Sequence, residues 1–183
     1  KKAEIKNLML SGKLNITENY RNSFAYSGGL VGGAEYVSFT DITTNVAVTA
    51  KKGSAPYPWS YVGGFAGTVK NADFLRCVNN GTVTTDGDYV SGFAAKSETT
   101  TYTSCVNNGA ITGRTKIGGF GGAVKSTKTV DSYNTGTIGL AAYNGGNQGI
   151  GGLFGEMGYG STLTRCYNTG AVTGDCYVGG LVG

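Results

Sequence analysis

The sequence predicts an all-β fold, a parallel β-solenoid of five to six rungs with about 28 residues in each rung. Strand-forming residues dominate the composition, with 15 Val, 7 Ile, 23 Thr and 12 Tyr against 9 Leu, and such side chains suit a pleated strand and disfavour a helix. Glycine makes up 33 of the 183 residues without a Gly-X-Y period, which excludes collagen. Two short motifs also recur in a fixed order. Stacked copies of one unit bury the core that a single unit cannot close.

The first motif reads Gly-Gly, an apolar residue, a small or apolar residue, and Gly. Intact copies lie at residues 28–32, 63–67, 118–122, 151–155 and 179–183, and a weakened copy, Ser-Gly-Phe-Ala-Ala, lies at residues 91–95. The second residue of successive copies is separated by 35, 28, 27, 33 and 28 residues. Paired glycines permit a tight bend or a close approach of two backbones, so we expect one such bend in every rung.

The second motif follows about 13 residues after the first and centres on asparagine. Its copies lie at residues 77–81, 105–109, 132–136 and 166–170, with a degenerate copy at residues 42–46. Each copy precedes a short segment of strand-forming residues, and its glycine predicts a corner with left-handed φ. The asparagines occupy one repeat position, so their amides should stack and hydrogen-bond from rung to rung. The predicted ladder consists of Asn79, Asn107, Asn134 and Asn168.

Three cysteines share a second repeat position. Cys77, Cys105 and Cys166 fall in one column, where Ser132 fills the remaining place. A small, half-apolar side chain suits an inward position beside a corner. Adjacent rungs would bring Cys77 and Cys105 to a spacing that does not forbid a disulfide, although we expect free buried thiols. The sequence has no Cys-x-x-Cys pair, so we expect no metal site.

A β-propeller is the main alternative architecture. Propeller blades contain about 40–50 residues and four strands. A unit of about 28 residues is too short for such a blade, and we therefore favour the solenoid, as a single domain over residues 1–183.

The composition argues against an enzyme. The chain contains no histidine, which removes Ser-His-Asp and Cys-His catalytic arrangements and every histidine metal ligand. The eleven carboxylates are scattered, and the one local pair, Asp86 and Asp88 around a glycine, is explained by turn chemistry. We therefore expect no catalytic residues, no metal and no cofactor. The net charge of +4 is dispersed, and no apolar run reaches the roughly 18 residues of a membrane span, so nucleic-acid binding and membrane insertion are not expected either.

The motifs resemble a known repeat family. Gly-Gly-Leu-Val-Gly at residues 28–32 and 179–183, together with Cys-Tyr-Asn-Thr-Gly-Ala-Val-Thr-Gly at residues 166–174, is similar to the GLUG-motif repeats of large bacterial secreted or cell-surface proteins. These include adhesin-like proteins and immunoglobulin A peptidases, in which the repeats lie outside the catalytic domain. The resemblance covers residues 28–183 and implies an extracellular repeat module without catalytic residues, cut from a longer surface protein.

Three units are longer than the others, and the extra residues fall at the same place in each. The insertions lie near residues 17–27, 50–60 and 141–149, and a solenoid holds such equivalent loops on one edge. They are rich in aromatic residues, which suit recognition of a glycan or a protein. Loops that cap or pad the flank of the solenoid are the favoured interpretation, and a recognition surface is the alternative. The candidate contact residues are Tyr20, Phe24, Tyr57, Trp59 and Tyr143.

The sequence leaves three functional hypotheses open. The first is a structural or adhesive module, which projects a partner domain or itself contacts a host or cell surface, with adjacent repeats of its parent chain as further partners. The second is a module that binds a carbohydrate or a host protein through the inserted aromatic residues. The third is an enzyme built on a solenoid, which the dispersed carboxylates make the weakest of the three.

Overall fold

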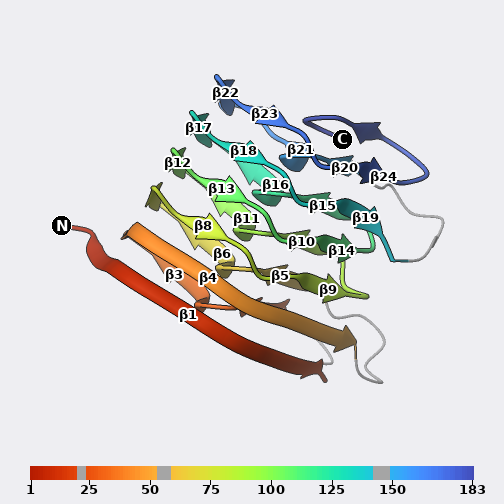
Figure 1. Cartoon of the computed structure of the whole chain (residues 1–183), viewed down its shortest axis with the longest axis horizontal. Helices are drawn as coiled ribbons and strands as arrows, with labels where there is room; N and C mark the ends of the chain where they lie inside the picture. Colours follow the sequence, from red (N-terminus) through yellow and green to blue (C-terminus); the bar gives the residue numbers. More distant parts are fainter. Residues whose placement is uncertain (20–23, 53–58, 142–148) are drawn as a thin grey trace.

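The structure is a computed structural model that describes residues 1–19, 24–52, 59–141 and 149–183. The described residues form 25 β-strands and no helix, and every pair of neighbouring strands is parallel. Strands of successive repeat units lie side by side, as Figure 1 shows. The predicted parallel β-solenoid is therefore confirmed.

The longest strands begin the solenoid. β1 (Ala3–Glu18) pairs along its whole length with β4 (Val37–Lys52). β4 pairs in turn with three short strands, so later rungs divide the same path into three segments. The resulting 14-stranded sheet also contains β7 (Asp73–Leu75), β8 (Val78–Asn79), β9 (Val83–Thr85), β12 (Thr101–Thr103), β13 (Val106–Asn107), β14 (Ile111–Gly113), β17 (Lys128–Val130), β18 (Tyr133–Asn134), β19 (Ile138–Leu140), β22 (Thr162–Thr164), β23 (Tyr167–Asn168) and β24 (Val172–Thr173).

Two smaller sheets complete each rung. The six-stranded sheet contains, in spatial order, β2 (Phe24–Gly28), β5 (Trp59–Gly63), β10 (Tyr89–Ser91), β15 (Lys116–Gly118), β20 (Gly149–Gly151) and β25 (Val178–Gly179). The five-stranded sheet contains β3 (Val31–Glu35), β6 (Ala66–Lys70), β11 (Ala94–Glu98), β16 (Gly121–Lys125) and β21 (Phe154–Met157). The first repeat motif is the turn that joins these two sheets.

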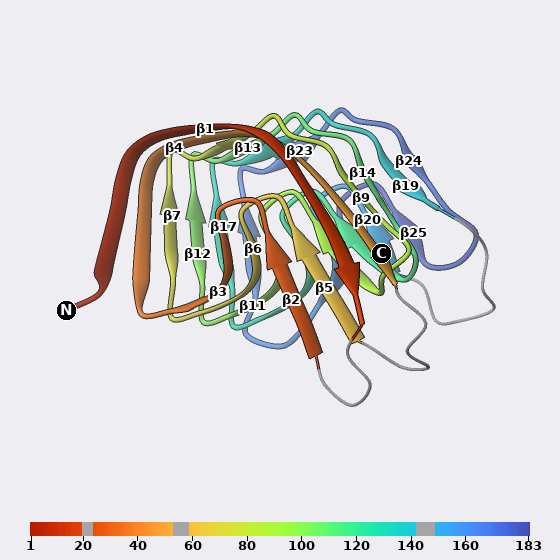
Figure 2. The same ribbon diagram turned by 90° about the horizontal axis from the view of Figure 1, so that it is seen from below.

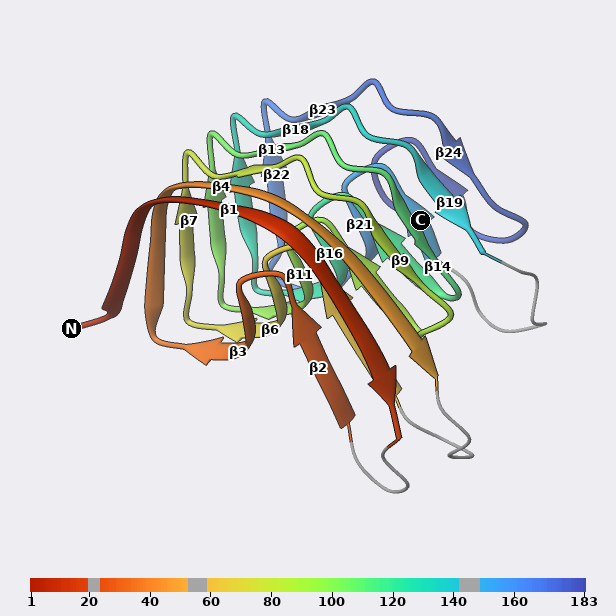
Figure 3. The ribbon, with the colours of Figure 1, turned by 60° about the horizontal axis from the view of Figure 1, so that its bottom comes forward.

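The long sheet forms an arch, and the turn between the two smaller sheets lies beneath it (Figures 2 and 3). Because this turn points toward the arch, the two smaller sheets diverge from it like the sides of a V. The faces that they turn away from the core lie opposite each other across the opening of the V. The last glycine of the motif allows this fold, because a Cβ on Gly67 would lie 2.5 Å from the backbone nitrogen of Ser27. We call the space between the two outward faces the outer angle.

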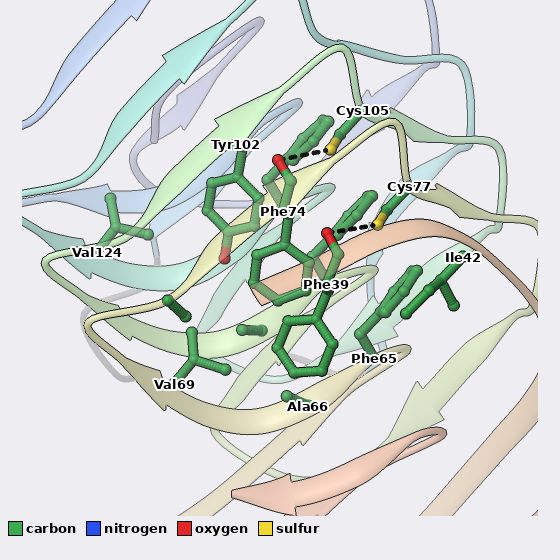
Figure 4. Close-up of a cluster of buried hydrophobic side chains, with 14 of the residues drawn as sticks. Phe39, Ile42, Phe65, Ala66, Val69, Phe74, Cys77, Tyr102, Cys105 and Val124 are labelled. Atoms are coloured by element: carbon green, nitrogen blue, oxygen red, sulfur yellow. Dashed lines mark hydrogen bonds between the residues drawn. The ribbon is translucent and has the colours of Figure 1, made fainter. Parts of the chain in front are cut away.

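The core consists of two clusters, one on each side of that turn. Between the arch and the five-stranded sheet, Phe39, Phe74 and Tyr102 stack from rung to rung, with ring centroids 4.6 and 4.9 Å apart, as Figure 4 shows. The second cluster, between the arch and the six-stranded sheet, is aliphatic. Its buried members are Val46, Val48, Ala50, Val62, Val83, Val90, Ile111, Ile117, Ile138 and Ile150. β-branched side chains at equivalent positions pack well on stacked strands.

The four predicted asparagines form one directional hydrogen-bond chain in the interior. The Nδ2 of Asn79 donates to Oδ1 of Asn107 (2.7 Å), Asn107 donates to Asn134 (2.6 Å), and Asn134 donates to Asn168 (2.7 Å). Each amide also donates to the carbonyl two residues further along its own rung. The hydroxyl of Thr44 donates to Asn79 and so begins the chain in β4.

The expected left-handed φ at the corner glycines is wrong. Gly81, Gly109, Gly136 and Gly170 do not have a left-handed φ, whereas a Cβ on any of them would collide with a backbone carbonyl of the preceding rung. These positions need glycine because the rungs approach closely there. Left-handed φ values occur instead at other corners, on residues that carry side chains. One column of them runs through Asn7, Asp41, Arg76, Ser104, Asp131 and Arg165.

All four cysteines are free in the structure. Cys77 and Cys105 are buried, and each thiol lies 3.5 Å from a backbone carbonyl of the preceding rung (Figure 4). Ser132 continues the column: its hydroxyl accepts a hydrogen bond from the backbone N–H of Cys105 (3.0 Å). In the described part of the chain, no helix is long and apolar enough to cross a membrane.

Candidate functional site

Along the chain, each of the three sequence insertions falls between a strand of the arch and a strand of the six-stranded sheet. They connect β1 to β2, β4 to β5, and β19 to β20. Tyr20, Tyr57 and Tyr143 lie outside the described residues. Phe24 and Trp59 were expected in loops, but the structure places them on strands, where they begin β2 and β5 and are direct register partners. The first two strands of the six-stranded sheet therefore present both rings.

Three tyrosines extend this aromatic surface along the solenoid axis. Tyr26, Tyr61 and Tyr89 occupy equivalent positions on β2, β5 and β10, and their ring centroids lie 5.2 and 4.5 Å apart. The ring of Phe24 lies 6.0 Å from that of Tyr61, and the ring of Trp59 lies 5.9 Å from that of Tyr89. We call these five residues the aromatic cluster.

Tyr61 and Tyr89 were not among the residues singled out from the sequence. The signal was present, because a tyrosine stands two residues before the first position of the Gly-Gly motif in three consecutive units, at residues 26, 61 and 89. The lengths of the insertions, by contrast, indicate the loops and not this column. In the next two units Lys116 and Gly149 take the equivalent position, so the tyrosine column ends after three rungs.

Two lysines lie over the tyrosine rings in the outer angle. The Nζ of Lys96, on the five-stranded sheet, lies 5.9 Å from the ring centroid of Tyr61, and that of Lys116 lies 5.6 Å from the centroid of Tyr89. Lys116 also forms an ion pair across the angle with Glu156 of β21. A cation over a ring face is attracted to its π electrons, so Lys96 joins the two sheets through Tyr61. Lys116 contacts Tyr89 within the six-stranded sheet and joins the two sheets through its ion pair with Glu156.

Burial in the outer angle changes the acidity of several groups. Tyr61 faces outward, yet only 6% of its surface is exposed, and this burial raises its pKa strongly. Burial also raises the pKa of Tyr89, and it lowers the pKa of Lys116 because a charged ammonium loses hydration there. Tyr61 and Tyr89 therefore remain neutral phenols that can donate and accept hydrogen bonds.

The outer members of the aromatic cluster remain open to solvent. Trp59 is 53% exposed, Phe24 51% and Tyr26 42%, whereas Tyr61 is covered by its neighbours. Grouped large apolar rings on a surface are uncommon in a protein that contacts nothing. Because the rings stand on paired strands, the backbone that carries them is already ordered when a ligand packs against them.

A shallow hollow of about 270 Å³ lies over the five-stranded sheet, and Lys96, whose ammonium group is over Tyr61, links it to the cluster. Lys96 and Glu156 belong both to its lining and to the outer angle, while Tyr159 bounds its far end under the ammonium of Lys125 (4.6 Å). The hollow and the aromatic cluster thus form one continuous surface, which we call the contact surface. It is aromatic at the six-stranded sheet and charged at the five-stranded sheet.

The carboxylates have structural surroundings. Asp88 was expected to be an ordinary turn residue, but it is nearly buried and pairs with Lys52 (3.1 Å) and Arg114. Asp86 accepts a hydrogen bond from the backbone N–H of Lys52 (2.7 Å). Glu18 is 1% exposed, and burial raises its pKa. Among the described residues no three His, Cys, Asp or Glu side chains are grouped to hold a metal ion.

Comparison of the chain with protein-family models, curated proteins and solved structures found no match. The resemblance to GLUG-motif repeats therefore stays a prediction from the sequence motifs.

Proposed function

We propose that this chain is a non-catalytic adhesive repeat module of a bacterial secreted or cell-surface protein, and that the contact surface binds a glycan. The carrying observation is the group of half-exposed rings, Phe24, Tyr26 and Trp59, held on two paired strands. The apolar C–H faces of a sugar ring pack against an aromatic ring, while its hydroxyls need nearby polar groups. The phenols and lysines of the outer angle supply such groups.

The architecture also suits a linear chain better than a compact ligand. Equivalent positions on neighbouring strands repeat about every 4.8 Å along the solenoid axis, close to the length of one sugar unit in an extended polysaccharide. The contact surface is shallow, whereas sites for small cofactors are enclosed and bury most of the ligand. The absence of histidine and the structural roles of Asp86 and Asp88 support a module without catalysis. A bacterial surface location is proposed from the GLUG-like motifs.

Binding to a printed glycan array tests the proposal. The wild-type chain should bind a subset of glycans, and Trp59→Ala should weaken that binding at least tenfold. The matched control is Tyr167→Ala, which removes a ring of similar exposure (50%) from the arch, where it stacks on Tyr133 at 4.7 Å. An unchanged signal after Trp59→Ala in a folded protein, or equal loss in both variants, would leave the aromatic cluster as padding of a rigid spacer. Capture of a host protein but no glycan would favour the protein-binding alternative.

A further inference from the structure

We propose that the glycan recognised by the contact surface is acidic, and that Lys96 is the residue that binds its anionic group. The inference rests on the proposed function and specifies its substrate class. Five charged groups line the outer angle and the adjoining hollow. These are the ammonium groups of Lys96, Lys116 and Lys125 and the carboxylates of Glu98 and Glu156.

The two carboxylates already have cationic partners. Glu156 pairs with Lys116 across the outer angle, and Glu98 lies 4.0 Å from Lys125 on the neighbouring strand. Among the described residues, no carboxylate lies within ion-pair distance of Lys96. The contact surface therefore carries one uncompensated positive charge, at Lys96.

The position of Lys96 makes that charge useful to a ligand. Its side chain is exposed, its ammonium group lies above the covered ring of Tyr61, and it forms part of the lining of the hollow. A sugar unit packed on Trp59 or Tyr26 would thus have a cation beside it, at the junction of the aromatic and charged halves. A cation at the edge of an aromatic platform favours a sugar that carries a carboxylate or sulfate over a neutral one.

The residues on the neighbouring rungs leave the positive charge of Lys96 accessible. In the column that contains Lys96, the flanking strands present Thr68 and Ala123, which are short and uncharged. In this column the first carboxylate along the solenoid axis is that of Glu156, which already pairs with Lys116. An anionic substituent can therefore approach Lys96 without repulsion from an unpaired carboxylate in the column. Electrostatic complementarity of this kind mainly sets specificity and association rate.

The emission of Trp59, the only tryptophan in the chain, reports directly on the contact surface. Two matched pairs of probes separate the kinds of anion: polygalacturonate against its carboxyl-reduced form, and dextran sulfate against dextran. We expect at least one acidic probe to bind tenfold or more tightly than its neutral partner at physiological salt. Lys96→Gln should remove most of that difference. The control is Lys70→Gln, an exposed lysine on the same sheet that lies 4.0 Å from Glu35.

Each outcome decides between the two proposals. Equal binding of acidic and neutral partners, with loss of both after Trp59→Ala when binding is measured as retention on the immobilised probes, overturns the acidic specificity and leaves the glycan-binding proposal intact. Equal effects of Lys96→Gln and Lys70→Gln would mean non-specific attraction to a basic surface, and would also overturn the role of Lys96. If no probe binds and the glycan array is likewise silent, both proposals fail.

Discussion

Asn79 occupies the space that a side chain on residue 64 would need: a Cβ built on Gly64 would lie 2.7 Å from Oδ1 of Asn79. The same relation joins Gly119 to Asn134, at 2.9 Å. The second glycine of the first motif therefore leaves the space that the asparagine of the second motif occupies, so the two motifs depend on each other. The ladder fills the interior at the point where the turn of the smaller sheets approaches the arch, and it lies between the core cluster that contains Phe39 and Phe74 and the aliphatic core cluster.

Replacement of Asn107 by alanine tests the ladder. Asn107 accepts one hydrogen bond from Asn79 and donates two, to Asn134 and to the carbonyl of Gly109, all in the interior. Its loss leaves several buried polar groups without partners, each at about 1–3 kcal/mol. We expect the free energy of unfolding to fall by about 3 kcal/mol, measured by urea denaturation. Asn108→Ala is the control, because its bond to Asn80 is exposed, and the expected change is within about 0.5 kcal/mol. Equal effects would contradict an energetic role for the ladder.

Two glycines three residues apart should respond in opposite directions to alanine. A Cβ on Gly136 would meet the backbone of Gly109, with the carbonyl carbon at 2.7 Å, so Gly136→Ala should destabilise the fold by about 3 kcal/mol. A Cβ on Gly139 would meet nothing within 4 Å, and its neighbour in register is Thr112. Gly139→Ala should therefore stabilise by about 0.5–1 kcal/mol, through the unfolded chain. Thermal melts of the two variants give the comparison, and a loss of stability in Gly139→Ala as well would contradict the role of close approach in selecting glycine.

The rung architecture and the asparagine ladder could be predicted because both depend on residues that recur at one repeat position. A repeated residue must meet its own copy in a parallel stack, so the column follows from the spacing alone. The backbone angle at Gly109 could not be predicted, since turn chemistry and close approach of rungs select the same residue. Tyr61 was missed because its burial depends on how the two smaller sheets fold against each other.

The ion pairs of Asp88 could not be predicted from the sequence either. The sequence predicts that Asp88 belongs to an Asp-Gly-Asp turn, but it does not indicate the ion-pair partners, Lys52 and Arg114, which come from the rungs on either side. Only the register of the stacked strands brings these three residues together. The position of the insertions was predicted because it follows from counting, whereas the placement of Phe24 and Trp59 on strands required the pairing of β2 with β5.

Removal of the charge on Asp88 should be far more costly than removal of an exposed one. Asp88→Asn leaves Lys52 and Arg114 without their shared, nearly buried carboxylate, and the loss of one member of such a group typically costs about 3 kcal/mol or more. Asp131→Asn breaks an exposed pair with Arg165 (2.5 Å), which should change stability by less than about 1 kcal/mol. Chemical denaturation at low and high salt distinguishes them, because salt screens the exposed pair only. Comparable losses would contradict a structural role for the buried group.

The buried carboxyl of Glu18 should make the fold less stable as the pH rises. Burial raises its pKa above the ordinary 4.5, with Asp86 acting in the same direction and Lys52, Ser27 and Ser60 opposing it. The folded state therefore holds a proton that the unfolded state has lost, between pH 4.5 and the raised value. Stability is greatest below that window and declines as the pH rises through it.

Glu18→Gln keeps the shape and removes the titration. The variant should be more stable than the wild type at pH 7, and the two should converge near pH 4.5, as followed by urea midpoints across pH 4.5–8. Asp41 and Asp131 titrate outside this pH range, because their arginine partners lower the pKa of each carboxyl below the ordinary 3.8. Their contribution to the free energy of unfolding is lost only as the pH falls below 3.8. Glu35→Gln, on an exposed strand position, serves as the control. A wild-type profile that keeps its slope in Glu18→Gln would place the titrating group elsewhere.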